Sequence, residues 1–70
     1  MSNWPAAKPR RVLAALVRIG WREKRCTGSH IVLARPGFPD FVFAFHDSEE
    51  LGSRMLAKIA KATGLSPDDL

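Results

Sequence analysis

Two short segments that contain glycine or proline divide the middle of this 70-residue chain, and they constrain its fold more than any other feature. They are Thr27-Gly28-Ser29 and Pro36-Gly37-Phe38-Pro39-Asp40. Both are expected to reverse the chain, because these residue types favour turns and glycine adopts positive φ at no steric cost. The segments on either side are predicted strands, and the last two are rich in β-branched or aromatic residues. The three predicted strands are Trp21–Cys26, His30–Arg35 and Phe41–Phe45.

An amphipathic helix is predicted before the strands, from Pro9 to Ile19. Proline suits a first helical position, and Gly20 suits the position just after a helix. The apolar residues of this segment recur at helical spacing and predict its buried face. They are Val12, Leu13, Leu16 and Val17.

A second helix is predicted from Leu51 to Thr63, ending at Gly64. Its expected buried face consists of Leu51, Met55, Leu56 and Ile59. The element order is then α-β-β-β-α, an α+β fold in which both helices cover one face of a three-stranded antiparallel sheet. We expect a flexible lead-in over residues 1–8 and a single domain over residues 9–70, closed by a short helical turn at Ser66-Pro67-Asp68-Asp69.

Three further expectations concern burial. Apolar residues on both faces of the third strand predict that it is central or covered on both sides. Trp21 follows the glycine at the end of the first helix and is expected in the core. Cys26 has no neighbouring base in the sequence, so burial is its expected state.

Length and composition limit the classes of protein to which the chain can belong. A 70-residue domain buries only about 60% of its unfolded surface and has no room for a deep cofactor cavity. Cys26 is the only cysteine, which excludes a disulfide framework and favours a reducing cytoplasm. No segment approaches the roughly 20 apolar residues of a membrane span, and the N-terminus does not resemble a signal peptide. We therefore expect a cytoplasmic protein without membrane association.

Basic side chains concentrate in the first half of the chain. Residues 1–36 hold eight of the eleven lysines and arginines but a single acid, Glu23, which gives a net charge of +7. Residues 37–70 hold three basic and six acidic residues, a net charge of −3. This asymmetry favours a polyanionic partner such as RNA or DNA. A solvated helix face together with a charged strand would produce the same pattern.

A histidine directly follows the first predicted turn. Histidine gains and loses a proton near physiological pH, so His30 is a candidate general acid or base for RNA cleavage. Lys24 and Arg25 are candidate phosphate contacts. Gly28 would let the backbone approach a phosphate closely, and Ser29 would donate a hydrogen bond to the phosphate or orient His30. Each has a structural alternative. His30 would be a strand histidine with a structural hydrogen bond, Lys24 and Arg25 would belong to a solvated strand edge, and Ser29 would only favour the turn.

Two more residues are secondary candidates. His46, after the third predicted strand, is a candidate second proton carrier, although a hydrogen bond to Asp47 or the backbone is the simpler interpretation. Arg11 on the first helix is a candidate contact to RNA backbone, with ordinary helix surface as the alternative. Two histidines and one cysteine without clustered carboxylates predict no metal site.

Several short motifs occur in a characteristic order along the chain. They are Leu16 through Gly20-Trp21, Gly28-Ser29-His30, a strand that ends at His46, Leu56 to Ile59, and Gly64-Leu65-Ser66. In this combination the chain resembles HicA-family toxins, the small ribonucleases of bacterial toxin–antitoxin pairs, over about Arg11 to Leu70. It departs from the usual pattern in two places. No proline stands one or two residues before His46, and Arg54-Met55 stands where the second helix usually opens with Gly-Thr.

The resemblance implies an activity and its partners. Members of this family cleave mRNA, have a fold like that of double-stranded-RNA-binding domains, and are neutralised by a HicB-type antitoxin. His30 matches the family's catalytic histidine. The implied function is a metal-independent endoribonuclease without a cofactor, which inhibits translation and growth.

Two other functions stay open on the sequence alone. One is a noncatalytic RNA-binding module with the same fold, which would recognise duplex RNA by its shape. Lys58 and Lys61 on the second helix are candidate contacts for such a module. The other is a protein-interaction module with no role in nucleic-acid binding.

Overall fold

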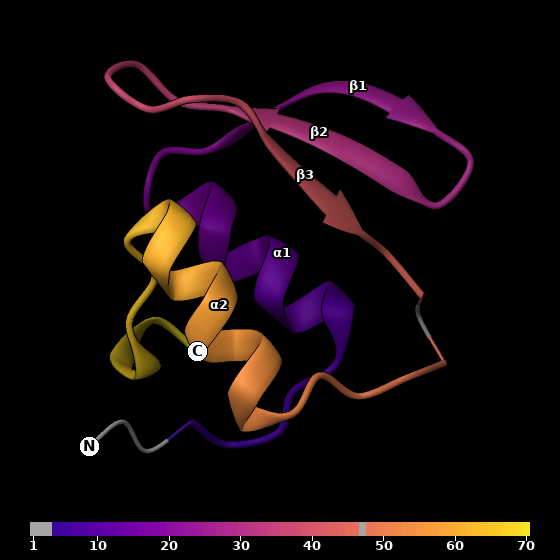
Figure 1. The fold of residues 1–70 in the computed structure, drawn as a ribbon, viewed down its shortest axis with the longest axis vertical. Coiled ribbons are helices and arrows are strands. Elements are labelled where there is room, and N and C mark those ends of the chain that lie inside the picture. Colours follow the sequence, from indigo (N-terminus) through magenta and orange to yellow (C-terminus); the bar gives the residue numbers. More distant parts are fainter. Residues whose placement is uncertain (1–3, 47) are drawn as a thin grey trace.

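The computed structural model describes residues 4–46 and 48–70, and it has two layers (Figure 1). Two helices form one layer and a three-stranded sheet forms the other. The elements in chain order are α1 (Pro9–Arg18), β1 (Arg22–Thr27), β2 (His30–Ala34), β3 (Phe41–Ala44), α2 (Ser53–Thr63) and the 3₁₀ helix η1 (Pro67–Asp69). This order confirms the predicted α+β class, with both helices on one face of the sheet.

The sheet is an antiparallel meander in which β2 is central and β1 and β3 are the edges. The prediction that the third strand is central or covered on both sides is therefore wrong. Phe43 is buried against the helices, but Val42 on the opposite face is 55% exposed. A continuous apolar run predicts a strand but does not distinguish a covered face from one that is open to solvent.

Trp21 lies at the centre of the core and is fully buried, as predicted. Its indole Nε1–H donates a hydrogen bond of 3.1 Å to the carbonyl oxygen of Thr63 at the end of α2. Its ring packs edge-to-face on Phe38 and Phe41, with ring centroids 5.4 and 6.5 Å away. One side chain therefore joins the end of α1, the loop before β3 and the end of α2.

Three burial predictions are wrong. Val17 is 51% exposed and Met55 is 48% exposed. Each helix buries a narrower face against the sheet than the spacing of its apolar residues predicts. On α1, Ala15 is buried in place of Val17. Cys26 is exposed, as is all of β1, and Figure 1 shows β1 as the strand farthest from the helices. The helical layer is too narrow to cover three strands.

The N-terminal segment joins the domain earlier than expected. Residues 1–3 of the predicted flexible lead-in lie outside the described residues. Trp4 belongs to the buried core, and Ala7 exchanges two backbone hydrogen bonds with Leu51, of 3.2 and 2.8 Å. At the other end of the chain the predicted helical turn is present as η1, where the Ser66 N–H donates to the Asp69 carboxylate at 2.8 Å.

Candidate functional site

A two-residue hairpin loop places His30 at the start of β2. Thr27 and His30 are paired across the β1–β2 ladder, with Gly28 and Ser29 between them. Gly28 has φ of 58°, whereas no non-glycine residue described has positive φ, so Ser29 has a negative one. This is the sign pattern of a type II′ turn, which requires glycine at its first central position. The Gly-Ser-His sequence thus fixes the point at which the histidine enters the sheet.

We expect Gly28→Ala to destabilise the domain by about 1–2 kcal/mol, because an L-residue is strained at positive φ. A Cβ at Gly28 would meet no atom within 4 Å, so backbone strain and not a clash is the cause. Urea unfolding followed by circular dichroism measures the change. Ser29→Ala, at the next position, is the control and should change stability by only about 0.5 kcal/mol. Equal losses for the two variants would contradict the turn assignment.

His30 lies on the outer face of the sheet, away from the helices. It is opposite Thr27 on β1 and Ala44 on β3, and residues directly opposite each other share a face. The next residue, Ile31, is buried on the helical side, so the His30 side chain points to solvent and is exposed. Arg25 is opposite Val32, two residues along β2, so it shares this outer face about 7 Å along the strand.

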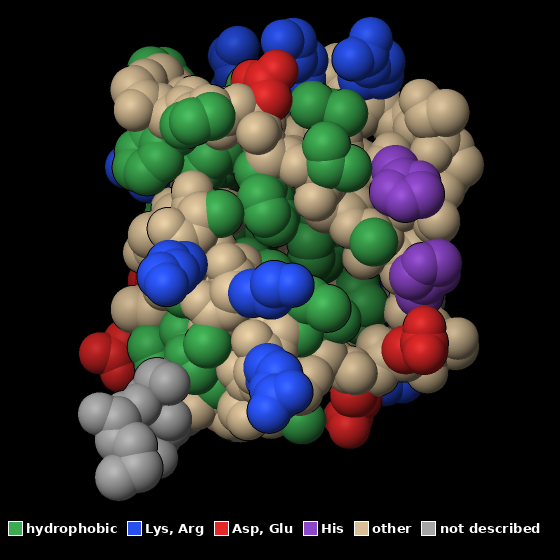
Figure 2. Space-filling view, in the orientation of Figure 1, with side chains coloured by type: hydrophobic (Ala, Val, Ile, Leu, Met, Phe, Trp, Pro, Cys, Tyr) green, Lys and Arg blue, Asp and Glu red, His purple; other side chains and the backbone are tan. Residues whose placement is uncertain are grey.

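His46 returns to the same edge of the molecule. The Phe45 N–H donates a 2.6 Å hydrogen bond to the Ser29 carbonyl oxygen, which extends the β2–β3 pairing to the hairpin loop. His46 is the next residue and is exposed. Figure 2 shows both histidine side chains of the chain along one edge of the molecule. The fold therefore brings together two imidazoles that are 16 positions apart in the sequence.

Lys24 is paired with an acidic side chain. Its Nζ lies 2.8 Å from the Asp40 carboxylate, in an exposed ion pair. Lys24 occupies the β-bulge between Glu23 and Arg25, where the strand changes register. Of the predicted RNA-binding residues, the fold thus gathers Arg25, Gly28 and Ser29 near His30 and pairs Lys24 with an acid. Asp40 was not predicted as the partner of Lys24, because the two residues are 16 positions apart and belong to segments on either side of β2.

Arg11 is not part of this arrangement. It is exposed on α1, in the helical layer, whereas His30 faces outward from the opposite side of the sheet. The fold does not place Arg11 on the outer face with His30.

A groove between β3 and α2 was not predicted. It has a volume of about 510 Å³ and a mostly apolar lining that includes Val42, Ala44, Met55 and Ile59, with His46 at its margin. Figure 2 shows it as a band of hydrophobic side chains between the sheet and the cationic side chains over α2. The exposed Val42 and Met55 would have been its only signal in the sequence, and both were assigned to buried faces.

Among residues 4–46 and 48–70, no three His, Cys, Asp or Glu side chains gather as a metal site requires. No helix in the described part of the chain is long and apolar enough to cross a membrane.

Residues 9–65 match the family model described as HicA toxin of bacterial toxin–antitoxin. No curated protein matches the chain at a significant level. The matched segment runs from the first residue of α1 past the end of α2, and it includes the hairpin loop and both histidines. Because the match covers well over half of the chain, this protein belongs to the HicA toxin family of bacterial toxin–antitoxin systems.

Proposed function

We propose that the protein is an endoribonuclease that cleaves mRNA in the cytoplasm and so inhibits translation and growth, with His30 as general acid/base. The observation that carries this proposal is the place of His30. It is exposed on the outer face of the sheet, directly after a tight turn and on the same face as Arg25. Family membership supports a toxin role, and this location supports proton transfer on a bound polyanion.

The proposed reaction needs no nucleophile from the protein, because RNA supplies its own 2′-hydroxyl. A base removes the proton of this hydroxyl, and the oxygen attacks the adjacent phosphorus. The bond to the 5′-oxygen breaks, and an acid protonates the leaving oxygen. His30 takes one of these two roles, and His46 on the same edge is the candidate for the other. The products are a 2′,3′-cyclic phosphate and a 5′-hydroxyl, and no metal enters the reaction.

The hairpin supplies the electrostatic part of the proposed site. The amides of Gly28 and Ser29 lie in the turn, between the paired Thr27 and His30, where backbone N–H groups can bind a phosphate oxygen. Arg25 adds a cation on the same face. Such groups stabilise the extra charge on the oxygens of the five-coordinate phosphorus in the transition state. Lys24 and Arg11 are more distant candidates for contacts to the RNA backbone.

The direct test is cleavage of an end-labelled mRNA fragment by the purified protein, with and without EDTA, followed by analysis of the new ends. We expect cleavage that EDTA does not change and that leaves cyclic phosphate and 5′-hydroxyl ends. Ends with a 5′-phosphate, or inhibition by EDTA, would contradict the proposed chemistry. RNA binding without any cleavage would support a noncatalytic RNA-binding module instead.

Arg25 and Lys24 provide a matched pair for RNA binding. We expect Arg25→Gln to weaken binding more than Lys24→Gln, because Arg25 shares the face of His30 while Lys24 is already paired with Asp40. Loss of one phosphate contact should lower the slope of log affinity against log salt concentration by about 0.7 for single-stranded RNA. Fluorescence anisotropy with a 2′-O-methyl RNA, which cannot be cleaved by this route, measures both. A larger effect of Lys24→Gln would contradict this assignment.

A toxin of this kind requires an inhibitor, and family membership implies an antitoxin partner. We propose a HicB-type protein in this role. It would neutralise the toxin by covering the surface around His30.

A further inference from the structure

We propose that the antitoxin adds an extended strand to the outer edge of β3, with apolar side chains in the groove between β3 and α2 and acidic side chains facing α2. The inference rests on the proposed antitoxin partner but not on RNA cleavage. It places the partner's strand at the edge of the outer face that carries His30.

The edge of β3 offers unpaired backbone groups. The bond from the Phe45 N–H to the Ser29 carbonyl makes these two residues a hydrogen-bonded pair of the antiparallel ladder. Hydrogen-bonded and non-hydrogen-bonded pairs alternate, so Phe43 also bonds to β2, while Val42 and Ala44 do not. The N–H and C=O groups of Val42 and Ala44 therefore point outward from the sheet. This is the pattern that an added strand completes.

The two edges of the sheet differ in how they are protected. The β1 edge carries Arg22, Glu23, Lys24 and Arg25 and is interrupted by a bulge, two features that discourage pairing with another strand. The β3 edge carries no charge and no bulge in residues 41–44. An unprotected edge beside an apolar groove is typical of a surface that a partner covers.

The groove next to this edge suits the side chains of an added strand. Alternate residues of a strand point to opposite faces, so every second side chain would enter the groove of about 510 Å³. Met55 lines it and is 48% exposed, which leaves apolar area of the groove open to water. A partner with apolar residues at alternate positions would remove this area from water.

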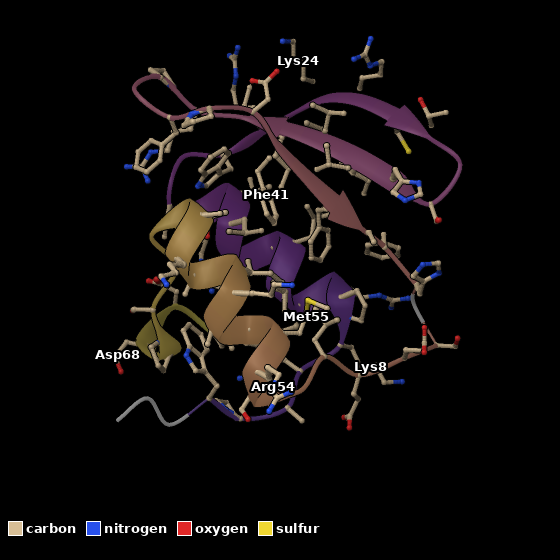
Figure 3. All side chains as sticks on the ribbon, viewed as in Figure 1. Lys8, Lys24, Phe41, Arg54, Met55 and Asp68 are labelled. Atoms are coloured by element: carbon tan, nitrogen blue, oxygen red, sulfur yellow. The ribbon has the colours of Figure 1, made fainter. Side chains whose placement is uncertain are left out.

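The charges around the groove indicate an acidic partner. Arg54, Lys58 and Lys61 are exposed and spaced four and three residues apart, so they form one cationic stripe along α2. No acid occurs in α2 to neutralise the stripe, and Lys58 lines the groove itself. Figure 2 shows cationic side chains over α2 at the border of the hydrophobic band, and Figure 3 labels Arg54 and Met55 on this helix. Acidic residues on the partner would match the stripe.

The opposite end of the groove limits where those acids can lie. Glu49 and Glu50 line the groove where the chain enters α2, so acidic side chains of the partner must face the stripe and not this end. RNA would match the stripe in charge, but a sugar–phosphate chain gains little from an apolar lining or from an open strand edge. The lining and the edge therefore favour a protein strand over RNA.

A strand in this position would also block the proposed active site. His46 lines the groove, and Ala44 is directly opposite His30 across the ladder. A segment paired with Ala44 would pass within one strand spacing of β3, about 5 Å, and would cover His46. Inhibition would then result from occupying the site of one imidazole and hindering access to the other.

Amide hydrogen exchange measured by NMR on the intact toxin tests the pairing directly. On binding of the cognate antitoxin, we expect slower exchange of the Val42 and Ala44 amides. The Cys26 amide is the matched internal control, because Arg25 and Thr27 pair with β2 and Cys26 points outward from the other edge. Unchanged exchange at Val42 and Ala44, protection at Cys26 instead, or no binding of the antitoxin would overturn the proposal.

Two pairs of variants test the same surface by affinity. Val42→Pro removes an outward N–H from the β3 edge, where proline is tolerated, and Cys26→Pro does the same on β1. Lys58→Glu reverses a charge at the groove, and Arg22→Glu reverses one on β1. We expect the Val42 and Lys58 variants to weaken antitoxin binding about tenfold, the effect of one lost hydrogen bond or ionic contact, and the β1 variants to bind normally. Weakening by the β1 variants alone would overturn the proposal.

The same exchange measurement with 2′-O-methyl RNA in place of the antitoxin separates the two classes of partner. Protection of Val42 and Ala44 by RNA but not by antitoxin would replace the proposal with an RNA-binding groove. Loss of the proposed nuclease function would be seen in the cleavage assay alone and would leave the exchange result unaffected.

Discussion

Replacing His30 with alanine is expected to slow RNA cleavage by roughly 100- to 10,000-fold, the usual contribution of a positioned proton-transfer group. The side chain is exposed on the outer face of the sheet, so its loss should change the free energy of unfolding by only about 0.5 kcal/mol. Binding of a 2′-O-methyl RNA should stay close to normal, because Arg25 and the turn amides remain. Single-turnover cleavage rates, urea unfolding and anisotropy measure the three quantities.

Thr27→Ala is the matched control for this experiment. Thr27 is directly opposite His30 and shares its face, but its hydroxyl does not ionise near neutral pH. We expect nearly normal cleavage from this variant. Equal cleavage by wild type and His30→Ala would assign the activity to another site or to a contaminating nuclease. Equal losses from the Thr27 and His30 variants would indicate a disturbance of the hairpin and not the loss of a catalytic group.

Trp21→Ala is expected to have the largest effect on stability. Truncation of a buried aromatic side chain costs about 3–5 kcal/mol, and the Thr63 carbonyl would also lose its hydrogen bond. A domain of this length has a total stability of about 4–10 kcal/mol, so the substitution removes much or all of it. Urea unfolding followed by circular dichroism measures the loss.

Two further variants show how much of that loss is due to the hydrogen bond and how much any truncation on α1 would cause. Trp21→Phe keeps an aromatic ring in the core but leaves the Thr63 carbonyl unpaired, so it should cost less, about 1–3 kcal/mol. Val17→Ala truncates a half-exposed side chain on α1 and should cost about 0.5 kcal/mol. A loss for Trp21→Ala no greater than that for Val17→Ala would contradict the central place of Trp21 in the core.

Local signals in the sequence predicted the elements of the fold well, and the packing of those elements less well. Pro9 begins α1, Gly28 lies in the hairpin loop and Gly64 follows α2, each as expected from its backbone preferences. The edge position of β3 was not predicted, because the order of strands in a sheet depends on contacts between distant segments. The same limit explains Val17 and Met55, whose exposure depends on the width of the facing layer.

In the candidate site, too, local features were predicted and contacts between distant segments were not. The Gly28–Ser29 turn indicated where His30 enters the sheet. The pairing register of β1 and β2 places Arg25 on the same face of the sheet as His30. The catalytic role of His30 stays a prediction. Lys24, which forms the ion pair with Asp40, occupies a bulge, and bulges leave no reliable mark in a single sequence.

The hydrogen bond between Trp21 and Thr63 has a consequence for the order of events during synthesis. Only α1 can cover the inner face of the sheet until α2 is complete, and the Trp21–Thr63 hydrogen bond needs the end of α2. The ribosome adds about 5–20 residues per second and hides the most recent ones in its exit tunnel. We therefore expect the nascent chain to stay unfolded, and harmless to the mRNA being translated, until Thr63 has emerged from the tunnel.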